Sequence, residues 1–224
     1  MASGQHRGTW GGCSYHLCWH RVPLATGMSQ AALLVIGLFA LLTMDAAIAH
    51  APFEGVGSFY GGLLHPLFVP THVLAVVGTG LLMGRQAPRW RWFPPASYVA
   101  GLAVGFAAMV SAYAPQSAGA VLLAAAAASG ALVALARPLP EILGCALALT
   151  TGLALALDSP PGGISVREAN VILIGTFCGA TILLLGVVAL TIMLCREWQR
   201  IGVRILGSWI AASAIMGLTL RLTR

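Results

Sequence analysis

The sequence predicts an all-α, polytopic membrane protein with about six transmembrane helices after a cleaved signal peptide. Of its 224 residues, 58% are hydrophobic and only 8% are charged, whereas soluble domains carry about 25% charged residues. Nearly uncharged apolar runs recur to the end of the chain. Each run is close to the ~20 residues that a helix needs to cross the hydrocarbon core. The composition therefore excludes a soluble globular domain, and we expect the lipid bilayer to surround most of the chain.

The first part of the sequence predicts two segments that precede the helical domain. Residues 1–27 show neither helical nor strand periodicity, and we interpret them as a non-native or disordered extension. Residues 28–49 have an apolar core and end in Ala47-Ile48-Ala49, a pattern typical of signal-peptide cleavage. Asp45 interrupts the apolar run before it reaches the length of a span. We therefore expect a cleaved signal peptide, and an uncleaved first helix is the alternative.

Six apolar segments follow within residues 50–224, the predicted transmembrane domain. They cover approximately residues 60–84, 93–113, 118–136, 139–157, 170–194 and 201–220. With the mature N-terminus outside, seven arginines lie on the cytoplasmic side and three lie outside. The seven are Arg85, Arg89, Arg91, Arg137, Arg196, Arg200 and Arg204, and the three are Arg167, Arg221 and Arg224. An excess of positive charge marks cytoplasmic loops, so this orientation is expected. The dispersal of the +6 net charge argues against nucleic-acid binding.

Two histidines in the first predicted span are the main candidate functional residues. They enclose the stretch His65-Pro66-Leu67-Phe68-Val69-Pro70-Thr71-His72. Ionisable side chains are costly in hydrocarbon and usually face a bundle interior or a pathway. Neutral imidazole suits divalent transition metals, so the pair predicts a metal site. The alternative is structural, with His65 capping a helix near the interface and His72 hydrogen-bonding to a neighbouring helix.

The spacing of the histidines gives the two prolines between them a role. In a straight helix, residues seven apart share a face but lie ~10.5 Å apart along the axis. Metal–nitrogen bonds of ~2.0–2.1 Å would not readily join both rings to one ion. Pro70 removes the backbone hydrogen bond to the carbonyl of Pro66, and broken helices form substrate sites in many transporters. We therefore expect a helix break at Pro66 and Pro70 that offers two imidazoles and one or more bare carbonyls.

Other ligand candidates lie outside the histidine stretch. After cleavage, His50 would offer an imidazole and a free α-amine, and Glu54 would offer an oxygen. The alternative is that His50 belongs only to a cleavage-site sequence. Asp158 begins an outer loop, where it would attract cations to the mouth of a site, although the sequence Asp-Ser-Pro-Pro-Gly favours a turn. The five cysteines form no CxxC pair and are most simply packing residues.

The stretch from Gly61 to Leu67, followed by His72 to Gly78, resembles the signature of the HupE/UreJ family. These are small bacterial membrane proteins that are associated with hydrogenase and urease clusters and regarded as nickel or cobalt permeases. The resemblance extends from Met28 to the C-terminus. The family pattern has an aspartate shortly before the second histidine, where this chain has Thr71. The change removes a hard anionic ligand, or a partner that orients an imidazole.

The resemblance implies a secondary transporter of Ni²⁺ or Co²⁺ in the bacterial cytoplasmic membrane, with the mature N-terminus outside. The metal is the transported substrate, and we expect no tightly bound cofactor and no enzymatic activity. His50 would capture the ion, and His65 and His72 would hold it, with Glu54, Thr71 and Asp158 in support. The sequence contains no phosphate-binding loop of the G-x-x-x-x-G-K-[ST] type. Expected partners are the metal, the bilayer and the hydrogenase or urease maturation proteins. A second copy of this chain, in a homo-oligomer, is a further candidate partner.

Two other functions remain as alternatives. The first is a non-transporting membrane partner of a maturation complex. The second is a haem-binding electron carrier in which His65 and His72 are axial ligands.

Overall fold

A computed structural model describes residues 57–87, 92–110, 117–137, 139–160 and 165–223, and within them it is entirely helical. The helices in these residues are α2 (Ser58–Phe68), α3 (Pro70–Gln86), α4 (Phe93–Val110), α5 (Ala118–Leu135), α6 (Glu141–Leu157), α7 (Val166–Met193) and α8 (Glu197–Leu222). All of them belong to one compact unit, Thr43–Arg224. The predicted all-α class is confirmed. The predicted extension and signal peptide lie outside the described residues.

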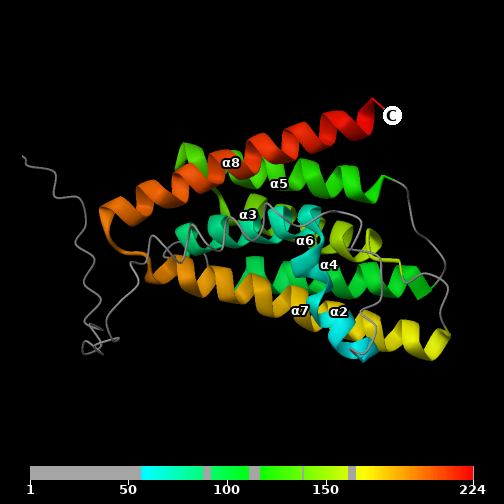
Figure 1. The fold of residues 1–224 in the computed structure, drawn as a ribbon. Coiled ribbons are helices and arrows are strands. Elements are labelled where there is room, and N and C mark those ends of the chain that lie inside the picture. Colours follow the sequence, from blue (N-terminus) through cyan, green and yellow to red (C-terminus); the bar gives the residue numbers. More distant parts are fainter. Residues whose placement is uncertain (1–56, 88–91, 111–116, 138, 161–164, 224) are drawn as a thin grey trace, which may run out of the picture. The chain divides into compact units, whose positions relative to one another are not determined.

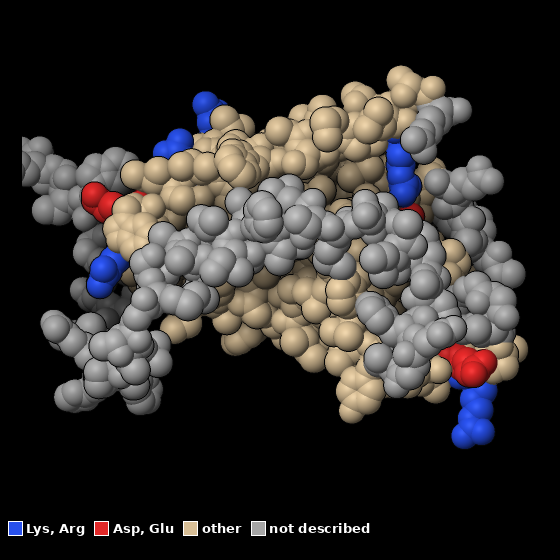
Figure 2. All heavy atoms as spheres, in the orientation of Figure 1, with Lys and Arg blue, Asp and Glu red and all other residues tan. Residues whose placement is uncertain are grey.

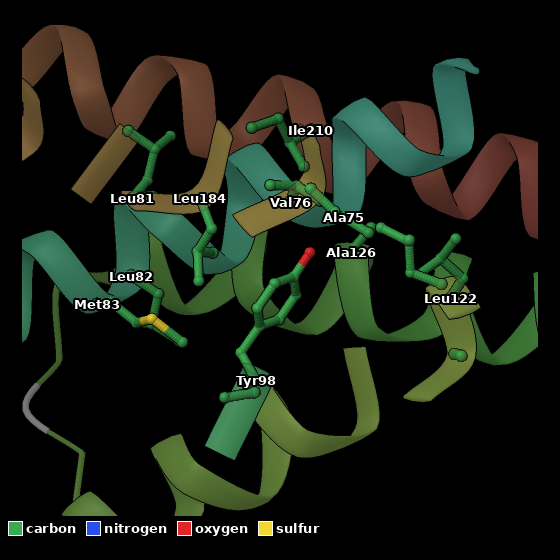
Figure 3. Close-up of a cluster of buried hydrophobic side chains, with 14 of the residues drawn as sticks. Ala75, Val76, Leu81, Leu82, Met83, Tyr98, Leu122, Ala126, Leu184 and Ile210 are labelled. Atoms are coloured by element: carbon green, nitrogen blue, oxygen red, sulfur yellow. The ribbon is translucent and has the colours of Figure 1, made fainter. Parts of the chain in front are cut away.

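Helix α3 is the central helix of this unit (Figure 1). It packs against α5 and α7, while α4 pairs with α6, α5 with α8 and α2 with α7. Eleven of the seventeen residues of α3 are buried. Its apolar side chains join those of the other helices in one core cluster, shown in Figure 3, which includes Val76, Leu82, Tyr98, Leu122 and Leu184. The sequence therefore places the second histidine, His72, at the start of its most buried helix.

The lengths of the helices support a membrane protein. Helices α5, α7 and α8 are long and apolar enough to cross a membrane, and α2 with α3 passes the same test as one broken span. Helices α4 and α6 are apolar but shorter. The described residues thus give three or four spans by length and composition, and the count of six stays a prediction. On the face shown in Figure 2, the charged side chains of the described residues lie toward the two ends.

Glycines bring α7 into backbone contact with α2. A Cβ atom added at Gly175 or Gly179 would collide with main-chain carbonyls of α2, those of Phe59 and Leu63. Pairs of small residues four apart permit such close approach between membrane helices. Because α2 carries His65, this contact fixes the position of one of the two histidines.

Alanine substitutions on α7 test this close contact. We expect Gly175→Ala to lower the free energy of unfolding by about 1–3 kcal/mol, because overpacking forces the backbones apart. Gly186 on the same helix is exposed, and an added Cβ meets no described atom within 4 Å. Gly186→Ala should leave the stability unchanged or raise it by about 0.5–1 kcal/mol. Thermal unfolding in detergent measures both, and equal stabilities of the two variants would contradict the α2–α7 contact.

Candidate metal centre

A sharp bend between α2 and α3 separates the two histidines along the chain. Helix α2 ends at Phe68 and α3 begins at Pro70, with Val69 extended between them (φ −92°, ψ 110°). Proline lacks a backbone N–H, so it can begin a helix but breaks one that it interrupts. The helix axes turn by 71° at this point. Pro66, the other proline expected at the break, lies buried inside α2.

The bend brings the imidazole rings of His65 and His72 together. Their centroids are 5.2 Å apart, and the ring planes are inclined at 71°. In a straight helix the two residues would be separated by ~10.5 Å. Two imidazoles on one tetrahedral ion, with bonds of ~2.0–2.1 Å, have centroids roughly 5 Å apart. His72 is fully buried and His65 is half-buried. The ring separation therefore fits two ligands of one ion.

The carboxylate of Asp158 lies beside His72. Oδ2 of Asp158 is 3.3 Å from Nε2 of His72, although the two residues are 86 positions apart in the chain. Asp158 ends α6, where its backbone N–H donates to the carbonyl of Ala154 (2.9 Å). Its side chain packs against Gly119 in the first turn of α5. The N-terminus of a helix stabilises a nearby carboxylate. A residue whose sequence favours a turn thus belongs to the candidate site.

Arg221 of α8 is the second partner of the Asp158 carboxylate. Its Nη1 lies 3.9 Å from Oδ1 of Asp158, and its side chain is 44% exposed, against 19% for Asp158. The guanidinium also lies over Gly119, where any side chain would collide with it. One carboxylate therefore faces a buried imidazole on one side and a more exposed guanidinium on the other. The sequence analysis used Arg221 only for topology, because no local pattern connects it to Asp158.

The ring nitrogens of His72 have different surroundings. Nδ1 is buried and has no hydrogen-bond partner among the described residues. In the tautomer that carries its proton on Nε2, His72 donates to Asp158 and leaves the lone pair of Nδ1 available. Metal-binding histidines commonly use this arrangement, in which a carboxylate accepts from the nitrogen that does not bind the metal. In this tautomer, Nδ1 of His72 is available to a ligand, while Nε2 donates to Asp158 and orients the ring.

Of the remaining candidate residues, only Thr71 is among those that the structure describes. Thr71 stands at the start of α3, and its hydroxyl is buried without a hydrogen-bond partner in the described part of the chain. His50 and Glu54 lie outside the described residues. Within residues 57–223, as far as they are described, no group of three or more His, Cys, Asp and Glu side chains is arranged to hold a metal ion. The described residues therefore offer two candidate ligands, His65 and His72, and a carboxylate beside one of them, rather than a complete coordination shell.

Comparison with known proteins identifies the family. The family model described as HupE / UreJ protein matches residues 29–220, which is most of the chain and includes His65, His72 and Asp158. No curated protein and no solved structure matches the chain. The match confirms the resemblance seen around the two histidines. It implies a membrane role in metal accessory function or transport for hydrogenase or urease. The chain therefore belongs to the HupE/UreJ family of membrane proteins.

Proposed function

We propose that this protein is a permease that carries Ni²⁺ or Co²⁺ across the bacterial cytoplasmic membrane to supply hydrogenase or urease maturation. The observation that carries the proposal is the pair of imidazoles, with centroids 5.2 Å apart, at a break in an apolar helix. Discontinuous helices form the ion sites of many secondary transporters. Imidazole binds several divalent transition metals, so the choice of nickel or cobalt rests on the family.

Each residue of the centre has a role in this proposal. His65 and His72 bind the ion, the latter through Nδ1. Asp158 accepts from Nε2 of His72 and holds its ring in place, which strengthens an imidazole as a ligand. In this way α6 supplies the carboxylate that the position of Thr71 lacks. While no cation is bound, Arg221 neutralises the negative charge of the Asp158 carboxylate. An arriving cation is attracted by the same carboxylate, so Arg221 competes with it.

The rest of the coordination shell comes from groups near the break. A transition-metal ion takes about four or more ligands. Pro70 can donate no hydrogen bond to the carbonyl of Pro66, so this oxygen is one source, and water is another. His50 and Glu54, near the predicted mature N-terminus, capture the ion at the outer face. A membrane potential that is negative inside favours entry by ~2.3 kcal/mol per charge per 100 mV. Such transport requires neither a tightly bound cofactor nor enzymatic chemistry.

The second candidate function is a non-transporting membrane partner of the maturation machinery. The association of the family with hydrogenase and urease favours it, and it predicts metal uptake that is independent of the histidines. A haem site is a poorer fit to the geometry. Axial ligands approach one porphyrin from opposite faces, whereas His65 and His72 meet edge to face at 5.2 Å.

Metal uptake by cells tests the proposal directly. In cells that lack other importers, we expect His65→Ala and His72→Ala each to reduce uptake of radiolabelled Ni²⁺ or Co²⁺ by more than roughly tenfold, because each removes a ligand. Asn170→Ala, at an exposed position on α7, is the control and should transport like the wild type. Equal uptake by all four proteins would refute the permease and favour the non-transporting partner.

The charges around Asp158 give a second test, in which two substitutions act in opposite directions. Asp158→Asn should weaken Ni²⁺ binding roughly 10–100-fold, because the ring of His72 loses its orienting partner. Arg221→Gln should strengthen binding by up to about fivefold, the scale of a partly exposed ion pair. Calorimetric titration of the purified protein measures both affinities.

Arg167→Gln is the matched control for this charge test. Arg167 is exposed in the first turn of α7, so the substitution removes the same charge away from the site. Weaker binding in Arg221→Gln than in Arg167→Gln would contradict the competition between Arg221 and the cation.

A further inference from the structure

Buried polar side chains repeat every seven residues along α3, starting at the candidate metal centre. His72, Thr79 and Gln86 are 0%, 1% and 5% exposed. Residues at this spacing lie on one face of a helix, and the three together cover about 21 Å along its axis. The hydrocarbon core is about 30 Å thick. The polar side chains on this face of the central helix therefore extend from the candidate metal centre over a length that is most of the thickness of the core.

Each of these side chains meets a polar group on α6, at the residue that ends it or in the segment that precedes it. The three contacts are Nε2 of His72 with Oδ2 of Asp158 at 3.3 Å, Oγ1 of Thr79 with Oγ1 of Thr151 at 3.3 Å, and Nε2 of Gln86 donating to the carbonyl of Arg137 at 2.8 Å. Thr151 and Asp158 are also seven residues apart, on one face of α6. We call these six residues the α3–α6 polar interface.

The polar interface has hydrogen-bonding capacity that its own contacts do not use. Nδ1 of His72 and Oε1 of Gln86 are buried without a hydrogen-bond partner among the described residues. The hydroxyl of Thr151 donates to the carbonyl of Leu147 (2.8 Å), so it accepts from Thr79, whose oxygen keeps its lone pairs. Buried polar atoms in native proteins are nearly always satisfied, and an exception calls for an explanation such as a water or an ion.

Two further observations concern unused hydrogen-bonding capacity near this interface and the packing across it. The hydroxyl of Tyr98 on α4 is also buried without a partner in the described part of the chain, and Figure 3 shows it directed into the core cluster. The main chain of Tyr98 contacts Gly152, next to Thr151. In addition, α3 packs extensively on α5 and α7 but only sparsely on α6. Separating α3 from α6 would therefore disrupt few contacts.

We propose that the divalent cation crosses the protein along the α3–α6 polar interface, with Thr79 and Thr151 as an intermediate binding site and Gln86 at the far end. This inference rests on the proposed function and names the path that leads from its metal site. Hydroxyl and carboxamide oxygens suit a hydrated cation, but they are weaker ligands for nickel than imidazole. Weak sites are an advantage here, because conduction requires that a bound ion can leave.

Valine substitutions remove the hydroxyl groups with little change in volume. Purified protein in liposomes is assayed twice, for the rate of Ni²⁺ transport and for Ni²⁺ affinity. The double variant Thr79→Val/Thr151→Val should transport roughly tenfold more slowly, because two contacts to a charged cargo are lost. Its affinity should change by less than about twofold, since Thr79 lies about 10 Å from His72 along the helix. Thr79→Ser/Thr151→Ser, which keeps both hydroxyls, should transport like the wild type.

Thr176→Val is the matched control. Thr176 on α7 is 1% exposed, and its hydroxyl donates to the carbonyl of Ile172 within its own helix (3.0 Å). This variant should keep the wild-type rate. Equal rates for the Thr79→Val/Thr151→Val variant and for the wild type would overturn the path while leaving the permease intact. Absence of transport by the wild type would overturn both.

Gln86→Leu provides a test at the other end if the valine variant fails to fold. A reduced rate with unchanged affinity supports the path, and an unchanged rate overturns it.

Discussion

Proline at the first position of α3 is the constraint on which the candidate metal centre depends. Pro70 can begin a helix but cannot continue α2, so the chain turns by 71° between the histidines. The turn brings the imidazoles from a helical separation of ~10.5 Å to 5.2 Å between ring centroids. Contacts of α2 with the glycines of α7 hold one side of the bend, and the buried helix α3 holds the other. The backbone break at Pro70 thus sets the separation of the two imidazoles.

The charges of the bundle divide between its two ends. Asp158 at the end of α6 lies between His72 and Arg221, so three helices distant in sequence meet at the metal centre. At the other end of α3, Arg85 lies within electrostatic range of Arg200 and Arg204. The positive-inside rule assigns such a cluster to the cytoplasmic face. This distribution supports the proposed orientation, in which the histidines lie toward the outside and the arginines toward the inside.

Much of the fold follows from the sequence, because apolar length alone predicts membrane helices. The segments expected at 93–113 and 118–136 correspond to α4 (Phe93–Val110) and α5 (Ala118–Leu135). The sequence predicts Asp158 only as a supporting residue at the mouth of a site. Its contact with His72 could not be predicted, because its turn sequence is ordinary and the contact arises only when α6 packs near α3. The seven-residue spacing of His72, Thr79 and Gln86 was present in the sequence. This spacing alone predicts no function, since scattered polar groups commonly join membrane helices, and only the partners on α6 and before it give it meaning.

In the proposed centre, His65 and His72 bind one metal ion together. X-ray absorption spectroscopy of the purified protein loaded with one equivalent of Ni²⁺ measures this most directly, because imidazole rings give characteristic outer-shell scattering. We expect two imidazole ligands with metal–nitrogen distances of about 2.0–2.1 Å, both lost in His65→Ala/His72→Ala. A coordination shell without imidazole, or one that is the same in the double variant, would contradict it.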